Sequence, residues 1–445
     1  MKKMIFTSRA YFLLIIFFLS SVLKGKASEV KDSSIANQRW NIHFQSTVVS
    51  QMHPGFSSSY SGNNSLSSHE EWQNSLTSTL FLGARLWNGA QAYFNPELTG
   101  GGGLSHTQGI AGFPNGEIYR VDSPTPKVSL ARLYVQQTFG FGQGLEKIEE
   151  GPNQLSGTLD SSRFTISLGR FSLNDFFDDN KYSHDPRTQF LNWSLMDYGA
   201  WDYAADTKGY TWGANFEFKR WNWTLRLAMV LVPQEANGID MDLNILHAHG
   251  YNLELEHSFF IGSLPGTVRW LAYQNTAHMG DYRTTLRTPS DSLNIARSRN
   301  YSVKYGFGMN VEQSLTSNIG VFARLSWNDG STETWAFTEI DRSVTLGVDL
   351  NGYQWKRNVD HMGIAFIHNQ LSHAHADYLA AGGYGFIIGD GELNYNPEEI
   401  FEFYYLYQLF HSLGISFDFQ EVLSPAYNAD RGPVPIFAGR LHLEF

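Results

Sequence analysis

The sequence predicts an all-β fold, a transmembrane antiparallel β-barrel of roughly sixteen strands. Three observations predict it. Apolar and polar residues alternate with a period of two, the alternating segments have similar lengths, and the links between them are alternately short and long. Alternation sends apolar side chains to one face of a strand and polar side chains to the other. Each segment has about ten residues, the length with which a tilted strand crosses a bilayer.

Composition supports a barrel over a helical membrane protein. The 445 residues include 15% aromatic and only 17% charged residues, and no run after the N-terminus reaches the ~18 apolar residues of a spanning helix. The formal charge of −11 disfavours nucleic-acid binding, because phosphate contacts need basic patches. Cysteine is absent, which excludes disulfides, thiolate metal sites and a cysteine nucleophile.

The first 27 residues read as a secretory signal peptide. Lys2, Lys3 and Arg9 precede the apolar run "AYFLLIIFFLSSVL", and Gly25 and Ala27 give a small-x-small site. We expect cleavage near residue 27, a short periplasmic segment over residues 28–40 and a single barrel domain over residues 41–445. Removing five basic residues and no acidic ones takes the formal charge from −11 to −16.

The strands follow one another along the whole mature chain. In "RFTISLG", for example, Phe164, Ile166 and Leu168 share one face and alternate with polar residues. Aromatic residues such as Trp87 and Trp221 stand at segment ends, as in the interfacial girdles of outer-membrane barrels. The predicted strands are centred near residues 46, 82, 93, 132, 167, 214, 227, 254, 270, 307, 323, 347, 365, 405, 416 and 440.

The connections predict the orientation of the barrel. Links after the second, sixth, eighth, tenth, twelfth and fourteenth segments are short, and those after odd-numbered segments are longer. Outer-membrane barrels have short periplasmic turns and long outer loops, so both termini are expected on the periplasmic side. The link "GFGQGLEKIEEGPNQLSGTLDSS", around residues 138–162, is long where a short turn is expected. It is either a periplasmic excursion or a sign that the strand count is off there.

The chain ends in "FAGRLHLEF", which alternates up to Phe445. In lipid every backbone amide must be satisfied within the protein, so a spanning sheet has to close on itself. We therefore expect the last strand to pair with the first and to turn its apolar face to lipid. The alternative is a secreted β-sandwich or β-helix, but the sequence contains none of the repeats that a β-helix needs.

Several long stretches carry a family resemblance. "YFNPELTGGGGLSHTQGIAGFPNGEIYR", "FFDDNKYSHDPRTQFLNWSLMDYGAWDYAADTKGYTWG", "WAFTEIDRSVTLGVDLNG", "GDGELNYNPEEIFEFYYLYQL" and "SPAYNADRGPVPIFAGRLHLEF" closely resemble the carbohydrate-selective porins of the OprB type. The resemblance implies a sixteen-stranded outer-membrane channel for passive diffusion of monosaccharides such as glucose into the periplasm. It also implies one or more outer loops folded into the lumen. The clearest departure is the polar stretch "GLEKIEEGPNQLSGTLDSS".

The expected partners follow from this resemblance. They are small neutral sugars, outer-membrane lipid and lipopolysaccharide, and the barrel assembly machinery, which would read Phe445. No cofactor and no nucleic acid are expected. The sequence leaves open whether barrels act singly or as trimers.

A sugar site needs polar side chains for the hydroxyl groups and aromatic planes for the ring faces. Arginines recur at inward positions, among them Arg85, Arg132, Arg163, Arg226, Arg269 and Arg324. They either form a ladder facing loop acids across the pore or hold the polar barrel wall in place. The strongest candidates are Glu97, Glu117 and Arg132. We expect the forked guanidinium of Arg132 to face the two carboxylates and to form with them a constriction that is positive on one side and negative on the other.

The fifth connection supplies a second set of candidates. Asp178, Asn180, Trp201 and Asp202 are hypothesised to line the channel mouth, with Trp201 stacking on a sugar face. The alternative is a structured outer loop in which Asx side chains cap turns.

Metal sites and catalysis are weakly indicated. Asp240, Asp242 and Asn244 form an oxygen-rich cluster without the glycine and distal Glu of an EF-hand loop. "SHAHAD" places two histidines and an aspartate at alternate positions, which fits a polar outer loop better than a metal site. Neither G-x-S-x-G nor H-E-x-x-H occurs. The sequence favours a channel over an outer-membrane enzyme. Between a sugar channel and a porin for another solute it separates poorly, and only the family resemblance favours sugar.

Overall fold

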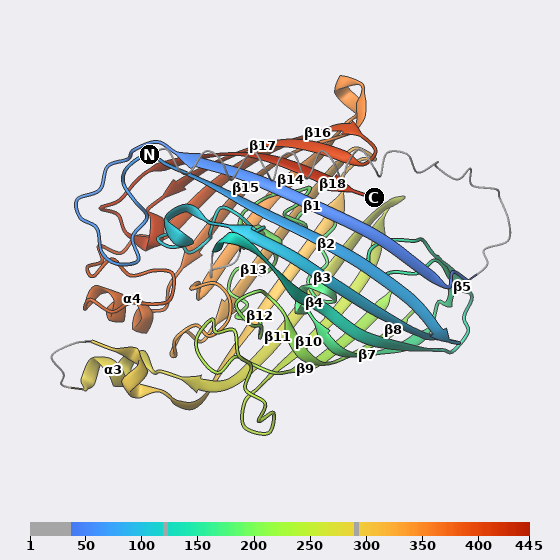
Figure 1. The fold of residues 1–445 in the computed structure, drawn as a ribbon, viewed down its shortest axis with the longest axis horizontal. Coiled ribbons are helices and arrows are strands. Elements are labelled where there is room, and N and C mark those ends of the chain that lie inside the picture. The colour runs from blue at the N-terminus through green and yellow to red at the C-terminus, as the bar shows by residue number, and fades with distance from the viewer. Residues whose placement is uncertain (1–36, 119–122, 289–292) are drawn as a thin grey trace. The chain divides into compact units, whose positions relative to one another are not determined.

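The computed structural model describes residues 37–118, 123–288 and 293–445. The predicted signal peptide, residues 1–27, and most of the predicted segment 28–40 lie outside the described residues. Within them, sixteen antiparallel strands close into a barrel (Figure 1). Every one of the sixteen predicted strand centres falls inside a barrel strand. The predicted fold class is confirmed.

Strand bounds in the barrel match the bilayer-crossing lengths expected from the sequence. The barrel strands are β1 (Trp40–His53), β2 (Glu71–Trp87), β3 (Ala90–Gly101), β4 (Ser123–Gly140), β7 (Arg163–Phe171), β8 (Thr211–Arg220), β9 (Trp223–Val230), β10 (His249–Ile261), β11 (Leu264–Met279), β12 (Asn300–Ser314), β13 (Ile319–Asn328), β14 (Arg342–Gly352), β15 (Arg357–Gln370), β16 (Glu398–Phe410), β17 (Leu413–Leu423) and β18 (Val434–Glu444).

The remaining elements lie in the connections. A two-stranded hairpin consists of β5 (Leu145–Ile148) and β6 (Gly157–Asp160). The helices are short: α2 (Trp193–Met196), α3 (Tyr282–Arg287), α4 (His373–Ala380), and the 3-10 turns η1 (Leu104–His106), η2 (Leu173–Asp175), η3 (Ile295–Ser298), η4 (Tyr353–Trp355) and η5 (Pro425–Tyr427). Among the described residues, no helix has the length and apolar character needed to cross a membrane.

The barrel closes between β1 and β18, as the C-terminal alternation predicts. Residues Gln45 to Met52 pair in antiparallel register with residues Glu444 to Phe437. The seam ends in two backbone hydrogen bonds between Phe44 and Phe445, at 3.0 and 3.2 Å. The last strand therefore has no free edge.

The outer wall is apolar and the inner wall is polar. Leu225 and Leu227 on β9 are each 43% exposed, which places them on the lipid-facing side. Between them, Arg226 points inward and forms ion pairs of 2.9 Å with Glu217, 2.9 Å with Glu254 and 3.0 Å with Glu256. Lipid-facing and lumen-facing residues thus alternate along the strand, as the sequence predicts.

The inward arginines of β9, β11 and β13 are each held by carboxylates. Arg269 on β11 bonds Glu256 at 2.9 Å and Glu312 at 3.4 Å, and Arg324 on β13 bonds Asp178 at 2.9 Å. Arg226 and Arg269 thus link neighbouring strands through carboxylates, whereas Asp178 belongs to the β7–β8 connection. Of the two predicted roles, Arg226 and Arg269 take the one that stabilises the polar wall, and Arg324 takes the one that faces a loop acid.

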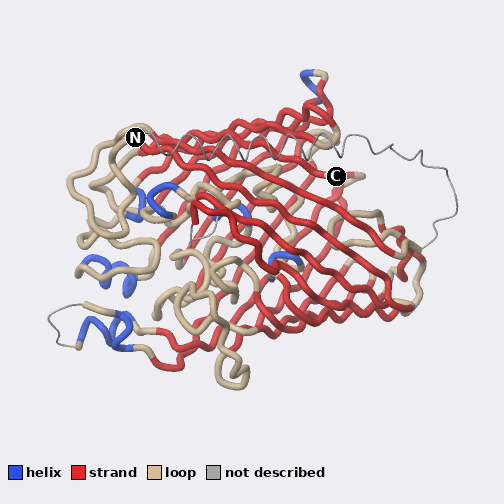
Figure 2. Tube along the Cα trace, viewed as in Figure 1, coloured by secondary structure: helices blue, strands red, loops and turns tan. Residues whose placement is uncertain are grey.

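Long connections gather at one end of the barrel, with α3 and α4, and β5 lies at the opposite end (Figures 1 and 2). The connection between β7 and β8, residues 172–210, runs across the lumen instead of staying outside. Its backbone forms hydrogen bonds with side chains of three distant strands. The N–H groups of Lys181 and Asn192 donate to Glu312 of β12 and Glu402 of β16. The carbonyl of Gln189 accepts from Arg440 of β18. The expectation of a loop folded into the lumen is confirmed.

Loop residues fill much of the lumen with a buried apolar core. Phe113 of the β3–β4 connection, Tyr198 and Trp201 of the β7–β8 connection, and Trp335 of the β13–β14 connection are all less than 2% exposed. A barrel of this size has an interior too wide for wall side chains alone to fill. The packed loops therefore decide where open space remains.

Candidate functional site

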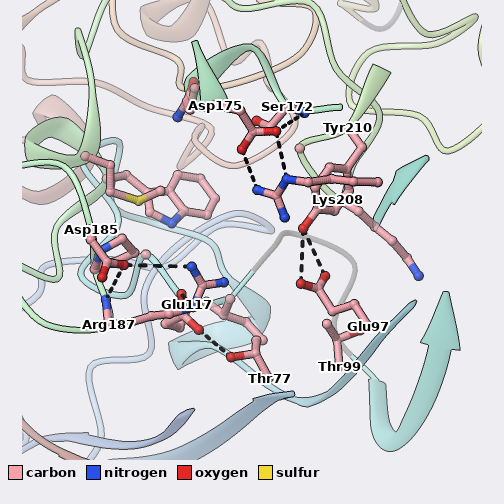
Figure 3. A pocket seen from close by; sticks show the side chains of 18 of the residues that line it. Thr77, Glu97, Thr99, Glu117, Ser172, Asp175, Asp185, Arg187, Lys208 and Tyr210 are labelled. Atoms are coloured by element: carbon pink, nitrogen blue, oxygen red, sulfur yellow. Dashed lines mark hydrogen bonds and ion pairs between the residues drawn. The ribbon is translucent and has the colours of Figure 1, made fainter. Parts of the chain in front are cut away.

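A cavity rich in charged side chains lies against the β2–β4 wall, beneath the inward loops. It has a volume of about 470 Å³. Strands β2, β3 and β4 form one side, and the β3–β4 and β7–β8 connections form the other. Its lining includes Arg132, Trp193 and Phe337. Figure 3 labels further lining residues: Thr77, Glu97, Glu117, Asp175, Asp185, Arg187, Lys208 and Tyr210.

A two-pronged ion pair joins the wall to the inward loop in this cavity. The Nε and Nη2 groups of Arg132 donate to the two oxygens of Asp175 at 2.7 and 2.5 Å. Asp175 ends η2 and also accepts from the backbone N–H of Ser172 at 2.9 Å, in a capping box. The carboxylate is fixed by its own turn, so it holds the Arg132 guanidinium in one orientation.

A second pair lies on the other side of the cavity. The Arg187 guanidinium is 3.3 Å from the Glu117 carboxylate and 3.8 Å from that of Asp185. Glu117 also accepts a hydrogen bond from the Thr77 hydroxyl (Figure 3). Burial raises the pKa of Glu117 above its ordinary value, although Arg187 and Thr77 oppose the shift.

Asp185 shows the reverse balance. Burial alone would raise its pKa, but Arg187, His442 and hydrogen bonds from the Arg187 N–H and the Thr188 hydroxyl together lower it. Two carboxylates beside one arginine thus have pKa values moved in opposite directions. The cavity therefore keeps one carboxylate charged and makes the other easier to protonate.

Glu97 is held between two hydroxyl groups. It accepts from Thr79 at 2.8 Å and from the Tyr210 hydroxyl at 3.1 and 3.2 Å. The Tyr210 ring lies 5.3 Å from the Arg132 guanidinium and 5.5 Å from that of Arg170. Tyr210 therefore connects the carboxylate to the cationic side of the cavity through both its hydroxyl and its ring.

Aromatic planes form part of the cavity lining. The Trp193 ring stacks on Phe337 with centroids 5.6 Å apart, and Phe337 lies 4.6 Å from Tyr203. Trp193 is fixed by a 2.8 Å hydrogen bond from its indole N–H to the carbonyl of Asn115. Apolar ring faces thus lie in the same cavity as the ion pairs.

The structure brings Glu97, Glu117 and Arg132 to one cavity, as the sequence predicts. The predicted contact between them is wrong. The Arg132 fork faces Asp175, and the arginine beside Glu117 is Arg187. The physical reason is that the β7–β8 loop enters the lumen between β4 and the β3–β4 connection and inserts its own charges.

The four candidates from the fifth connection do not line the cavity. Asp178 is fully buried against Arg324, and Asn180 donates to Asn310 at 2.7 Å. The Trp201 indole N–H donates to Asn252 at 2.9 Å, and Asp202 accepts from three backbone N–H groups of residues 335–337. The predicted sugar-stacking role of Trp201 is wrong, because its ring is only 1% exposed inside the loop core.

Arg85 lies away from this cavity, in the half of the barrel that carries the short turns. Its guanidinium donates to the carbonyls of Gln38 at 2.9 Å and Ser156 at 3.3 Å. It was predicted as part of the constriction. The structure instead uses it to hold the N-terminal segment and the β5–β6 hairpin to the wall.

The weak metal candidates Asp240, Asp242 and Asn244 lie in the β9–β10 connection. Asp240 and Asn244 are exposed, and Asp242 caps its own turn by accepting from the Asn244 N–H at 2.9 Å. Across the described ranges, no group of three or more His, Cys, Asp or Glu side chains has the geometry of a metal site.

Asp175, Arg187 and Tyr210 were missed by the sequence reasoning. All three lie within the fifth connection, in the stretch from "SLNDFF" to "DTKGY". Asp175 follows a serine by three residues, which is a capping-box signal, and Arg187 follows an Asp-Pro turn. These signals locate turns, but they do not show which turn reaches the lumen.

Comparison with known proteins agrees with the fold. The structure matches the high-pH structure of Pseudomonas putida OprB with a TM-score of 0.68 and 13% identity, over 92% of this chain and 94% of that one. The low-pH structure of the same protein matches with a TM-score of 0.50 and 10% identity, over 92% of this chain and 93% of that one. The outer membrane channel DcaP of Acinetobacter baumannii matches with a TM-score of 0.51 and 8% identity, over 93% of this chain and 99% of that one.

At these identities the matches show the fold alone. A search among curated proteins found no match. The sequence model described as "Carbohydrate-selective porin, OprB family" matches residues 63–445, which is most of the chain and includes all residues of the cavity beyond β1. The chain therefore belongs to the OprB family of carbohydrate-selective porins.

Proposed function

We propose that the cavity between the β2–β4 wall and the inward loops is the selective constriction of a passive channel for monosaccharides such as glucose. The protein is a bacterial outer-membrane porin, and its family and fold indicate a channel rather than an enzyme. The observation that carries the proposal is the combination of fixed ion pairs and aromatic faces in one cavity of about 470 Å³.

The ion pairs suit a neutral solute rich in hydroxyl groups. Arg132 with Asp175 and Arg187 with Glu117 each present donors and acceptors whose charges are largely balanced. Charge-assisted hydrogen bonds of this kind are strong and directional. A hydroxyl group can donate to a carboxylate and accept from an arginine at once, whereas an anion or a cation can bond only one member of each pair and is repelled by the other.

The aromatic residues suit the apolar faces of a sugar ring. Trp193, Phe337 and Tyr210 place ring surfaces against the cavity. Binding must remain weak enough for the solute to leave, which a few contacts in an otherwise wet cavity provide. The proposed substrate class rests on this combination: the ion pairs bind hydroxyl groups of the solute, and the aromatic rings contact its apolar ring face.

Single-channel conductance in a planar bilayer tests this function. We expect the ion current to fall saturably as glucose is titrated, and to fall much less with a polyol of matched size. Glu117→Ala and Arg132→Ala should weaken the glucose effect. Conductance without any glucose dependence would favour a porin for another solute, and absence of conductance would contradict the channel itself.

The surroundings of the barrel complete the proposal. We infer that outer-membrane lipid and lipopolysaccharide contact the apolar outer wall, and that the barrel assembly machinery recognises the C-terminal strand through Phe445. We also infer that residues 1–27 are a cleaved signal peptide that directs export. Crosslinking to the assembly machinery, compared between the wild type and Phe445→Ala, tests the recognition step.

A further inference from the structure

The β4–β7 connection departs from the other connections at its end of the barrel. The sequence marked residues 138–162 as a long link where a short turn is expected, and the structure folds part of it into the β5–β6 hairpin. The barrel around it remains sixteen-stranded, since β4 pairs directly with β7. The link is therefore an excursion, and the strand count is correct.

The hairpin is bound to the inside of the wall. Asn41 on β1 donates to the carbonyls of Gly151 at 3.1 Å and Gln154 at 3.0 Å. Further along, Glu146 forms ion pairs with Arg163 at 2.6 Å and Lys219 at 2.9 Å. These contacts come from β1, β7 and β8. The hairpin is therefore attached to strands other than the β4 and β7 that it connects.

The tip of the hairpin reaches the level of the constriction. Asn95 on β3 donates to the Asn153 side chain at 2.9 Å, and Asn95 lies directly opposite Arg132 in the β3–β4 pairing. Pro152 and Asn153 line the cavity of the constriction. Pro152 and Asn153 also line a second cavity, so the tip of the hairpin lies between the two cavities.

The second cavity has a volume of about 340 Å³. Its wall combines the hairpin with inward side chains of β2, β3, β4, β7 and β8, and it shares Asp175 with the first cavity. The Tyr93 and Tyr134 rings, with centroids 5.1 Å apart, line it. Polar groups in the lining include Gln136, Asn153, Thr158 and Asn215.

One buried amide has unused hydrogen-bonding capacity. Asn215 on β8 is 2% exposed, and its Oδ1 has no hydrogen-bond partner among the described residues. A buried polar atom without a partner is costly, so its hydrogen bond is expected to go to a molecule in the cavity. A hydroxyl group can supply it.

From this geometry we propose that the β5–β6 hairpin builds a second sugar subsite on the periplasmic side of the constriction. The subsite takes the same class of solute, a neutral molecule with hydroxyl groups and an apolar ring face, and it uses Asn215, Gln136 and the paired tyrosine rings. This proposal rests on the proposed function, since a sugar reaches the subsite by passing the constriction. The charged residues of its lining already have protein partners, since Arg163 pairs with Glu146, Asp175 with Arg132 and Glu217 with Arg226, and Arg85 donates to backbone carbonyls.

The absence of native cysteine allows each cavity to be tested by a single introduced thiol. Thr158→Cys places a reporter on the exposed rim of the second cavity, and Lys208→Cys places one in the constriction. A third reporter, Thr316→Cys, lies in the exposed β12–β13 turn and serves as the control. A charged thiol reagent is added to the protein in lipid vesicles, and its reaction rate at each cysteine is followed by mass spectrometry, which reports positions inside and outside the lumen alike.

We expect glucose to slow modification of Thr158→Cys and of Lys208→Cys several-fold, and to leave Thr316→Cys unchanged. Adding Asn215→Leu should abolish the protection at Thr158→Cys and leave that at Lys208→Cys. Gln136→Leu, tested in the same way, should give the same result and covers the case in which Asn215→Leu fails to fold.

Each other outcome overturns the subsite. Protection at Lys208→Cys without protection at Thr158→Cys would remove the subsite and leave the proposed function intact. Loss of protection at both reporters in Asn215→Leu would mean that the lumen contains a single site. Absence of protection at both in the unsubstituted background would contradict the sugar channel and the subsite together.

Discussion

Arg132 on β4 and Asp175 at the end of η2 form a two-pronged ion pair, with N–O distances of 2.7 and 2.5 Å, although 43 residues separate them in the chain. The pair fixes the inward loop to the barrel wall at the cavity. The width of the channel at this point therefore depends on a side-chain contact as well as on the strands.

Replacing Arg132 by Lys should weaken glucose binding. A lysine keeps the charge but cannot bind both oxygens of Asp175, so the loop loses part of its anchor. Loss of one charge-assisted hydrogen bond corresponds to about 1.5 kcal/mol, or roughly a tenfold higher half-blocking glucose concentration. Titrating glucose against the single-channel current measures this half-blocking concentration. Arg342→Lys, at an exposed position outside the lumen, is the control. An equal rise of the half-blocking concentration in both variants would contradict a role of the Arg132–Asp175 ion pair in glucose binding.

Glu117 should make the ion selectivity of the channel depend on pH. Its pKa is raised by burial, so it takes up a proton at a higher pH than an ordinary glutamate does. As the pH falls through that raised pKa, the cavity loses a negative charge, and the preference for potassium over chloride should decrease. The reversal potential in a KCl gradient, followed from about pH 8 to pH 4, shows this step.

The variant Glu117→Gln should lack that step, since it has no carboxyl group to titrate. Exposed Glu235 in the β9–β10 connection provides the matched control, and Glu235→Gln should titrate like the wild type. An unchanged pH step in Glu117→Gln would assign the titration to another group, such as Asp185.

Asp178 should be important for the stability of the inward loop. Its carboxylate is fully buried against Arg324, and removing it leaves a buried guanidinium unpaired. We expect Asp178→Ala to lower the free energy of unfolding by about 3–5 kcal/mol. Urea unfolding in lipid vesicles, followed by tryptophan fluorescence, measures it. The neighbouring residue Asp179 is exposed, so Asp179→Ala should have little effect, and equal losses in the two variants would contradict the assignment.

The barrel was predictable from sequence because its pattern is local. A strand with lipid on one side and water on the other has to alternate, and each segment shows this without reference to any other. The same logic placed Arg226 on the inner wall between Leu225 and Leu227. Closure at Phe445 followed from the rule that a sheet in lipid leaves no edge.

The constriction was predictable only in part. Glu97, Glu117 and Arg132 lie on or beside adjacent strands, so strand order brings them together. Their partners Asp175 and Arg187 arrive on a loop whose path is set by contacts with distant strands. No local pattern encodes that path. Trp201 was misassigned for the same reason, because its exposure depends on which way the loop folds.

The hairpin should narrow the channel. The backbone N–H of Phe141 already bonds the carbonyl of Ser162 at 2.8 Å, so replacing residues 143–160 by a two-residue turn closes the chain without moving β4 or β7. Removing the tip opens the space below the constriction, and the ion conductance should rise well above that of the wild type. Glucose should still block the current through the constriction, which the hairpin touches only at Pro152 and Asn153. The matched control shortens the exposed β9–β10 connection at the other end of the barrel. An unchanged conductance in the hairpin variant would show that the constriction alone sets the resistance of the channel.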